Sequence, residues 1–498
     1  MKRSISFPLA ALSGVLLMLI QPAPSFTFLA PFALFPLLVA IADQTKWSER
    51  FLLGWVAGIM QWGGTCHWIE GTLARHGGMS EALAIALFVG FSLTKGLHAA
   101  AFAALAGPVF GVRYAAPVIA LLWAGLERTH GELGFTWLLL GNAAQDMGVP
   151  LRLAPITGVY GVSFVFALMS ASLACWYLRR ERMQLAWCAP LLALYLLPAL
   201  PEPKAADLEA VALQPNIPED KVLTDEQLHG AYGTYAKQTL EMAMNPTRER
   251  PSLLLWPETP ASLYYESDAK FREMAASLAR LSATPFLFGT VRFDKQGNPY
   301  NTAQMLTSNG DPSGTYDKVR LVPFGEYVPP VFNMFVSKVS NEAGTFQPGE
   351  GIRLFSTPAG KLGVFICYES VFADYVRDIT KQGATVLVNL TNDGYFSSDA
   401  ARQQHLRVAR MRAAENARWL LRPTNDGISA SIDPAGRVVR EFPVEVLTTG
   451  RLPYSPAYPG DMTPYTRYGD WFAWLSLLSG LVLSGVAMRR TLRGQVGD

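Results

Sequence analysis

The stretch KLGVFICYES, residues 361–370, contains the strand, the cysteine and the turn around which the polar half of this chain is organised. Residues 363–366 are apolar and rich in β-branched and aromatic side chains, which predicts a buried strand. Residues 371–380 predict a helix with Ser370 as its cap and Asp374 in its first turn. Cys367 lies between the two, at a helix N-terminus, where the thiolate is favoured. The alternative is an ordinary buried core cysteine.

The composition excludes several classes of protein. The chain has 498 residues, too many for one ordinary domain, and half of them are hydrophobic while only 16% are charged, which is too apolar for a soluble protein of this size. A net charge of +2 gives no indication of nucleic-acid binding. Cys367 is the only one of four cysteines in the long polar half, so we expect a free thiol there. No metal-ligand spacing or phosphate-binding glycine loop is present, and no cofactor is expected.

Eight apolar segments predict a multi-pass α-helical membrane bundle. These segments are residues 8–20, 27–42, 51–68, 82–110, 115–126, 156–178, 185–197 and 471–488. Loops assigned to the cytoplasm carry eleven Lys and Arg residues and the short outer loops carry three, which places both termini in the cytoplasm. We therefore expect a membrane domain over residues 1–200 with about seven helices, a periplasmic domain over 201–470, and an eighth helix with a cytoplasmic tail over 471–498.

Ionisable residues interrupt two of the apolar segments. Lys95 and His98 lie in one long segment and His67 lies in another. Such residues either line a functional polar cavity or extend their charged ends toward the membrane surface, and the sequence leaves both readings open. The outer loop over residues 134–141 is aromatic and apolar but too short to span, so we expect it to lie at the membrane interface near the active site.

The polar block alternates segments typical of strands and of helices. The expected strands are residues 208–213, 253–256, 286–293, 302–306, 363–366, 385–390, 419–422 and 428–432. The expected helices are residues 225–244, 268–281, 371–380 and 401–417. Central runs such as residues 385–390 are largely apolar, as in strands covered on both faces, so the fold class is an α/β layered sandwich.

Two further stretches supply polar groups that could act with Cys367. Residues 253–258, LLLWPE, form an apolar strand that ends in Glu258, and residues 316–326, YDKVRLVPFGE, contain Lys318 and Glu326. A cysteine nucleophile needs a base, which a buried carboxylate can supply, and its tetrahedral intermediate needs a positive charge near the oxyanion. Taken singly these residues are weak signals, because a carboxylate after a strand is commonly a helix cap and a Lys near a Glu is commonly a solvated pair.

Together the three stretches resemble the Glu-Lys-Cys triad of the nitrilase, or carbon–nitrogen hydrolase, superfamily. With seven spans before that domain and one after it, the whole chain is similar to the apolipoprotein N-acyltransferase family. The similarity extends to residues 214–218, QPNIP, 300–302, YNT, 410–413, RMRA, 422–429, RPTNDGIS, and 463–465, TPY. The resemblance implies an αββα nitrilase-like domain in the periplasm, on a multi-pass protein of the bacterial inner membrane.

The same resemblance implies a role for each site residue. Cys367 is the expected nucleophile, Glu258 the general base and Lys318 the cation that stabilises the oxyanion. Glu326 would position Lys318 or relay protons, while Tyr368 and Glu369 would shape the site. The implied reaction passes an acyl chain from a phospholipid, through a Cys thioester, to the N-terminal amine of a diacylglyceryl apolipoprotein, the last step of bacterial lipoprotein maturation.

Two other functions remain open from the sequence. The chain could be a membrane-tethered nitrilase-type amidase acting on a small amide, or a membrane protein whose outer domain only binds a ligand. The intact triad argues against simple binding, and the apolar segment 331–336, together with eight spans, favours a lipid substrate over a small amide. Departures from the family pattern at Thr136, Val222 and residues 394–395 affect expected substrate-contact loops and leave the acyl and lipoprotein preference open.

Overall fold

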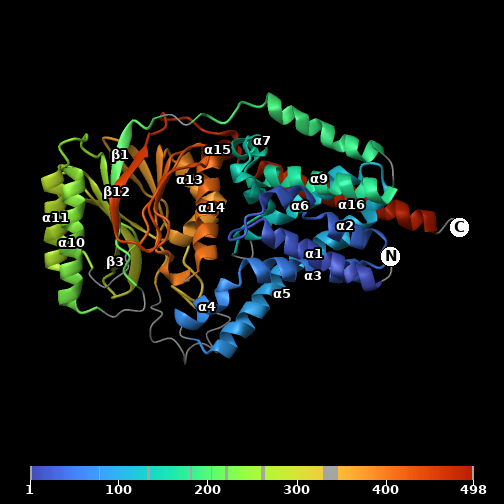
Figure 1. Cartoon of the computed structure of the whole chain (residues 1–498), viewed down its shortest axis with the longest axis horizontal. Helices are drawn as coiled ribbons and strands as arrows, with labels where there is room; N and C mark the ends of the chain where they lie inside the picture. Colours follow the sequence, from blue (N-terminus) through green and yellow to red (C-terminus); the bar gives the residue numbers. More distant parts are fainter. Residues whose placement is uncertain are drawn as a thin grey trace. The chain divides into compact units, whose positions relative to one another are not determined.

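The computed structural model describes residues 3–77, 79–131, 135–179, 182–202, 205–218, 223–258, 264–328, 346–396 and 398–495. The chain divides into two compact units (Figure 1). The helical unit comprises Met1–Glu70, Glu81–Leu200 and Arg467–Asp498, and the α/β unit comprises Gly71–Ser80 and Pro201–Thr466. The apolar segment expected over residues 331–336 lies outside the described residues.

Each of the eight apolar segments is helical in the structure. The helical unit contains α1 (Arg3–Leu19), η1 (Thr27–Phe32), α2 (Phe35–Ala42), α3 (Trp47–Thr65), α5 (Glu81–Ala106), η2 (Gly107–Gly111), α6 (Ala115–Arg128), η4 (Leu140–Asp146), α7 (Gly148–Leu151), α8 (Ala154–Thr157), α9 (Val159–Arg179), η5 (Arg182–Leu196) and α16 (Trp471–Gln495), and α4 (Trp68–Arg75) follows α3. In the described part of the chain, three stretches are long and apolar enough to cross a membrane: Glu81–Gly111, Val159–Arg179 and Trp471–Arg489. The number of crossings therefore stays a prediction.

The helical unit has a buried centre and an apolar surface. Helix α9 is mostly buried and packs against α2, α6 and η4, whereas Leu475, Leu478 and Val482 of α16 are exposed. Helices α3 and α5 approach closely because α3 presents small residues to α5. A Cβ atom at Gly54 would collide with the Ala99 carbonyl oxygen. Small residues at helix contacts and apolar side chains on the outside are typical of a bundle in lipid.

The α/β unit contains twelve strands in the described residues and four principal helices. The strands are β1 (Leu208–Gln214), β2 (Leu253–Leu255), β3 (Phe286–Phe293), β4 (Pro299–Leu306), β5 (Pro312–Asp317), β6 (Leu354–Thr357), β7 (Gly360–Ile366), β8 (Val386–Leu390), β9 (Leu420–Arg422), β10 (Ala430–Ile432), β11 (Val438–Glu441) and β12 (Thr448–Tyr454). The helices are α10 (Asp225–Ala243), α11 (Ala269–Ser282), α13 (Ala373–Lys381) and α14 (Asp399–Asn416), with α15 (Pro464–Tyr468) near the end of the unit.

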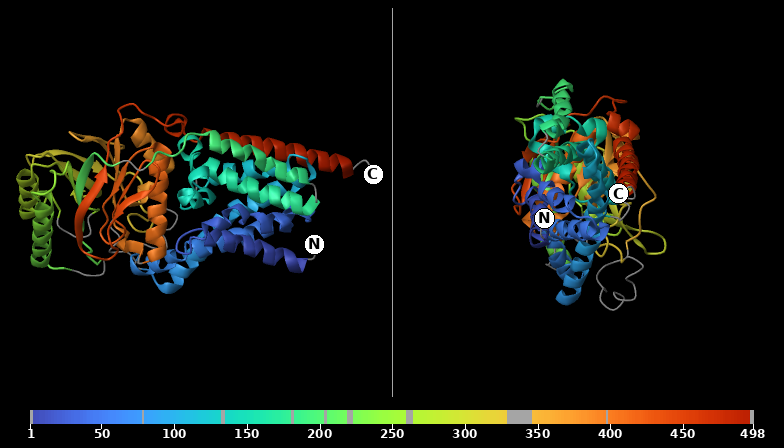
Figure 2. Two further views of the ribbon diagram at one scale, coloured as in Figure 1. Left: turned by 45° about the horizontal axis from the view of Figure 1, so that its top comes forward. Right: turned by 90° about the vertical axis from the view of Figure 1, so that its right-hand side faces the viewer.

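These elements form a four-layer sandwich. One six-stranded sheet has the order β12-β1-β2-β3-β4-β5, and the other has the order β11-β10-β9-β8-β7-β6. Helices α10 and α11 cover the first sheet and α13 and α14 cover the second, so the layers run helix, sheet, sheet, helix (Figures 1 and 2). Each helical layer has its own apolar core, with Tyr232 and Phe271 against Phe286 on one side and Val376 and Leu406 against Leu387 on the other. The expected αββα fold class is confirmed.

Parallel pairing brings several strand ends to one edge of each sheet. Strands β1, β2 and β3 are parallel in the first sheet, and β7, β8 and β9 are parallel in the second. In an α/β sheet the residues that follow parallel strands lie near one another at the carboxyl edge. Glu258 follows β2 and Cys367 follows β7 at such edges.

All eight strands expected from the sequence are present, but four others were missed. Strands β5, β6, β11 and β12 pair antiparallel near the outside of the sheets and carry many polar or half-exposed residues, so they lack the apolar run used to recognise the others. The helix expected over residues 371–380 begins later, at Ala373, because residues Cys367–Val371 form a separate 3-10 turn, η7.

Candidate active site

Strand ends supply the three residues of the expected triad. Lys318 follows β5 directly, Cys367 follows β7 directly, and Glu258 lies three residues beyond β2. Glu326 lies in the turn between Pro323 and Tyr327, which pair with each other through an isolated bridge. The structure brings Glu258, Lys318 and Glu326 into direct contact, and Cys367 interacts electrostatically with all three.

Lys318 is at the centre of this group. Its side chain is 1% exposed, and its Nζ donates to Glu258 Oε1 at 3.2 Å and to Glu326 Oε1 at 3.0 Å. Burial alone would lower the pKa of Lys318, but the carboxylates of Glu258 and Glu326 raise that pKa well above its ordinary value. Lys318 therefore remains a cation, as an oxyanion-stabilising group must.

Asn301 of β4 connects the two carboxylates, and the sequence analysis assigned it no role. Its Nδ2 donates to Glu258 Oε1 and to Glu326 Oε1, each at 2.7 Å. The backbone N–H groups of Asn392 and Val322 donate to the other carboxylate oxygens, at 2.9 Å to Glu258 Oε2 and 2.8 Å to Glu326 Oε2. These donors hold the carboxylates of Glu258 and Glu326 in place around Lys318.

Glu258 has the properties of a buried base. It is 7% exposed, and burial raises the pKa of its carboxyl, an effect that Lys318 opposes and the nearby Glu326 charge reinforces. A carboxylate with a raised pKa accepts a proton more readily than an exposed one. This environment suits a group that takes a proton from a thiol and later returns it.

Cys367 is held in a left-handed backbone conformation with a φ of 50°. A residue with a side chain adopts that conformation only when its surroundings enforce it. The residue is 6% exposed, and burial, together with the Glu258 charge, raises the pKa of its thiol well above the ordinary value despite Lys318. The expectation that a helix N-terminus favours the resting thiolate is therefore wrong, because burial outweighs it. The resting group is a thiol, which makes a neighbouring base necessary.

Ser370 does not cap the following helix, contrary to the sequence prediction. Helix α13 begins after Phe372 without a side-chain cap, although Asp374 does lie in its first turn as expected. The Ser370 hydroxyl instead lies 2.9 Å from His405 Nε2 of α14. A three-residue pattern cannot reveal this partner, which is 35 residues further along the chain.

Glu369 joins the nucleophile turn to the Lys318 loop. This fully buried carboxylate accepts the Ile366 N–H at 2.7 Å, and it also accepts the Val319 and Arg320 N–H groups at 2.7 and 3.0 Å. The Tyr316 hydroxyl donates to the same carboxylate. Glu369 thus fixes the spacing of Cys367 from Lys318.

Tyr368, the residue after the nucleophile, is buried. Its ring packs perpendicular to Phe372, with ring centroids 5.3 Å apart. It contributes an apolar wall to the turn over Cys367–Val371. Among the residues that the structure describes, no cluster of His, Cys, Asp or Glu is arranged to hold a metal ion.

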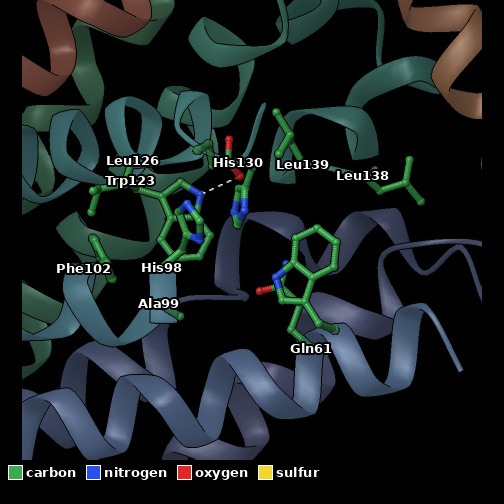
Figure 3. Close-up of a pocket in the computed structure, with 11 residues that line it drawn as sticks. Gln61, His98, Ala99, Phe102, Trp123, Leu126, His130, Leu138 and Leu139 are labelled. Atoms are coloured by element: carbon green, nitrogen blue, oxygen red, sulfur yellow. Dashed lines mark hydrogen bonds between the residues drawn. The ribbon is translucent and has the colours of Figure 1, made fainter. Parts of the chain in front are cut away.

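The helical unit has a pocket of its own, between α3, α5 and α6, in which ionisable side chains lie among apolar ones (Figure 3). Its wall includes Gln61, Trp62, His98, Trp123, Glu127, His130, Leu138 and Leu139. The His98 and His130 rings lie against each other with centroids 3.7 Å apart. His67 lies just after the end of α3 and is exposed, so it is not part of this pocket.

Lys95 has a structural partner beside this pocket. It is 3% exposed, its Nζ donates to the Phe135 carbonyl at 2.7 Å, and it lies 4.7 Å from the centre of the Trp62 ring. Glu127 Oε1 accepts the Leu140 N–H at 2.9 Å. Residues 135–139 are not helical, so their backbone groups need partners within an apolar bundle. Lys95 supplies one of these partners, Glu127 binds the N–H at the start of η4, and Lys95 does not reach toward a surface.

Two family models match parts of this chain. Residues 232–449 match the carbon-nitrogen hydrolase family, and residues 13–172 match the apolipoprotein N-acyltransferase N-terminal domain. Solved structures similar to part of the chain include a carbon-nitrogen hydrolase from Helicobacter pylori, with 16% identity and a TM-score of 0.38 over 49% of this chain and 89% of that one. An amidase from Nesterenkonia sp. has 19% identity and a TM-score of 0.39, over 51% of this chain and 93% of its own.

The family-model match over residues 232–449 places the α/β unit of this protein in the carbon–nitrogen hydrolase class of enzymes. The apolipoprotein N-acyltransferase of Geobacter metallireducens is 31% identical, over 97% of this chain and 95% of its own. Those of Nitrosomonas europaea and Methylococcus capsulatus are 30% and 31% identical over 94% and 97% of this chain, and 96% of each relative is covered. The chain belongs to the apolipoprotein N-acyltransferase family, and the resemblance seen in the sequence motifs is confirmed. It is a membrane protein with an enzymatic α/β unit.

Proposed function

We propose that this protein transfers an acyl chain from a phospholipid to the N-terminal amine of a diacylglyceryl-cysteine apolipoprotein. The observation that carries the proposal is the buried Lys318 between Glu258 and Glu326, on strand ends next to Cys367, in a chain of the apolipoprotein N-acyltransferase family. A cation, a base and a thiol in one buried group are the parts that acyl transfer through a thioester requires.

The first half of the reaction forms the thioester. Glu258 takes the proton of the Cys367 thiol, and the sulfur attacks the ester carbonyl carbon of the phospholipid. Lys318 stabilises the negative oxygen of the tetrahedral intermediate. The intermediate collapses with breakage of the ester C–O bond, and Glu258 returns its proton to the departing lysophospholipid oxygen.

The second half discharges the thioester. The neutral amine of the apolipoprotein attacks the thioester carbonyl, and Glu258 takes the proton that the nitrogen loses. Breakage of the C–S bond leaves the amide, and the thiolate recovers the proton from Glu258, so the enzyme returns to its starting state. The low exposure of Cys367 supports transfer over hydrolysis because water has little access to the thioester.

The proposed location is the bacterial inner membrane, with the catalytic domain in the periplasm. The proposed domains are a membrane domain over residues 1–200, a catalytic domain over 201–470 and a last helix with a cytoplasmic tail over 471–498. The charge asymmetry of the loops and the apolar helices support this arrangement. A phospholipid donor is then available in the same membrane.

Product analysis with the purified full-length protein tests the proposed function. The protein is mixed with phospholipid and a synthetic diacylated lipopeptide, and we expect equal amounts of N-acylated lipopeptide and lysophospholipid. Lys318→Met should reduce transfer at least ~100-fold because the oxyanion loses its cation. The control is Lys237→Met, which removes an exposed lysine paired with Glu241 and should leave transfer unchanged.

Two results would contradict the proposal. If the protein hydrolyses small amides rapidly and leaves the lipopeptide unmodified, it is a membrane-tethered amidase instead. Near-normal transfer by a folded Lys318→Met protein would remove Lys318 from the reaction.

A further inference from the structure

A second group of buried ionisable residues contacts the turn that carries the nucleophile. His405 belongs to α14, Arg422 to β9, and Asp393 to the turn η8 (Asp393–Phe396), and none of their side chains has exposed surface. Ionisable groups are costly to bury unless they are paired, so three of them together need an explanation. The triad chemistry described above uses none of them.

The three side chains contact one another, with Arg422 Nη2 also 3.1 Å from His405 Nδ1, and the group reaches Cys367 through His405. Arg422 Nη2 donates to Asp393 Oδ2 at 2.8 Å, and Asp393 Oδ1 lies 2.8 Å from His405 Nδ1. The other ring nitrogen, His405 Nε2, lies 2.9 Å from Ser370 Oγ and 3.1 Å from the carbonyl oxygen of Cys367. His405 therefore contacts the nucleophile's own backbone and another residue of the same turn.

The charges fix which ring nitrogen faces the turn. Burial would raise the pKa of Asp393, but Arg422 and His405 lower it, so Asp393 is a carboxylate that accepts the Nδ1–H of His405. Burial and Arg422 lower the pKa of His405, which leaves Nε2 as an acceptor for the Ser370 hydroxyl. A protonated ring would instead donate from Nε2 to the Cys367 carbonyl. In both protonation states His405 binds the turn over Cys367–Val371.

The turn needs such a partner because Cys367 has a φ of 50°. In residues other than glycine, this conformation persists only where the surrounding structure enforces it. Asn389 Nδ2 also reaches the Cys367 carbonyl, at 3.4 Å, and Arg422 Nη1 in turn donates to Asn389 Oδ1 at 2.6 Å. Arg422 thus supports both side chains that approach the carbonyl of the strained residue.

We propose that His405, oriented by Asp393 and Arg422, is a positioning residue that holds the Cys367 turn in its left-handed conformation and aims the thiol at Glu258 and the acyl donor. This inference deepens the proposed function and rests on it. The thiol is already buried and protonated at rest, so a change in its direction affects the step in which Glu258 takes the proton. A small misplacement of a reacting atom can cost about 100-fold in rate.

The experiment compares variants of the full-length protein in detergent, with two readouts. One is the rate of acyl-enzyme formation at high and low phospholipid, and the other is the rate at which iodoacetamide alkylates the Cys367 peptide. His405→Phe keeps a ring without its nitrogens. We expect it to lower the maximal acylation rate and the alkylation rate about 10- to 100-fold with little change in the KM for phospholipid. His405→Gln, whose amide can both donate and accept, should recover part of the loss.

The control is Glu415→Gln on the same helix. Glu415 is fully buried and paired with Arg412, so the variant disturbs an ion pair within α14. It should lower thermal stability and leave both rates unchanged. Equal loss of both rates in Glu415→Gln and His405→Phe would overturn the inference, because damage to the helix would then be sufficient. Unchanged rates in a folded His405→Phe protein would overturn it too.

Ser370→Ala decides the question if His405→Phe does not fold. It removes only the hydroxyl that contacts His405 Nε2, and we expect a smaller loss, about 3- to 10-fold in the alkylation rate, in the same direction. An unchanged alkylation rate in Ser370→Ala would then contradict the inference. The alkylation readout needs no lipid, so a wild-type protein that forms no acyl-enzyme would count against the proposed function and leave the positioning result intact.

Discussion

Lys318 determines the electrostatics of the site at the scale of single residues. Glu258 and Glu326 share the Asn301 amide as a donor, and two buried carboxylates this close would not both stay ionised without a cation between them. Lys318 supplies that cation and remains available to an oxyanion. Burial raises the pKa of both Cys367 and Glu258. The two shifts suit each other, because a thiol that is protonated at rest needs a strong carboxylate base to remove its proton.

The pKa of Glu258 predicts how acylation depends on pH. Glu258 must be a carboxylate to accept the thiol proton, so the rate falls as the pH drops through its pKa. Burial raises that pKa, and the acidic limb should therefore lie above about 4.3, the ordinary value for Glu. We expect Glu258→Gln to slow acylation at least ~100-fold and to abolish this limb. The measurement is the single-turnover acylation rate from pH 4 to 8.

The exposed Glu273 provides a matched control for this titration. Glu273→Gln should reproduce the wild-type profile. An acidic limb that persists unchanged in Glu258→Gln would assign the titrating group to another residue.

Strands and turns arrange these residues at the scale of elements. Cys367, Lys318 and Glu258 each follow a strand, and Glu369 joins two of the strand ends through the N–H groups of Ile366, Val319 and Arg320. The distance between nucleophile and cation therefore depends on one buried carboxylate. This explains why an acidic residue stands two positions after the nucleophile.

Glu369→Gln tests this connection between elements. A glutamine offers one acceptor oxygen where the carboxylate offers two, so at least one buried N–H loses its partner, at a cost of about 1–3 kcal/mol. We expect a fall in the thermal unfolding midpoint of a few degrees and slower acylation, measured on the detergent-solubilised full chain. Glu441→Gln, on the edge strand β11, is the control and should change neither quantity. Wild-type stability and rate in Glu369→Gln would show that the turn and the loop are held by other contacts.

The sequence could predict the triad but not the residues that hold it. Glu258, Lys318 and Cys367 carry a local signal, because each ends or follows a recognisable apolar strand or belongs to a motif. Asn301 lies in the family motif YNT but carries no sign of its role, and His405 carries no local signal, since their partners lie 43 and 38 residues away and only the folded sheets bring them together. The polar edge strands were missed for the related reason that pairing with neighbours, rather than an apolar run, makes them strands.

The whole molecule combines an apolar helical unit with an α/β enzyme unit. The helices expose Leu475, Leu478 and Val482 on α16, as a surface in contact with lipid would, while the α/β unit has two helix-covered sheets with polar edge strands. The loop charges distinguish the two sides of the membrane. The orientation of the enzyme unit follows from the odd number of crossings that we expect before it.

Reporter fusions test this orientation. A reporter fused after Pro201 should be active only in the periplasm, and one fused at Asp498 only in the cytoplasm, because eleven of the fourteen loop charges counted fall in the loops that we assign to the cytoplasm. Activity is measured with a periplasmic and a cytoplasmic reporter at each position. A Pro201 fusion that reports the cytoplasm would show that the number of crossings before the enzyme unit is even.

The most direct test of the account is to detect the acyl-enzyme. Purified protein incubated with phospholipid alone should gain the mass of one acyl chain on the Cys367 peptide, and hydroxylamine should remove it. A diacylated lipopeptide should discharge the acyl group and become N-acylated, whereas Cys367→Ala should show neither step. Turnover of phospholipid and lipopeptide by wild-type protein with no acyl mass on Cys367, or full transfer by Cys367→Ala, would contradict the account.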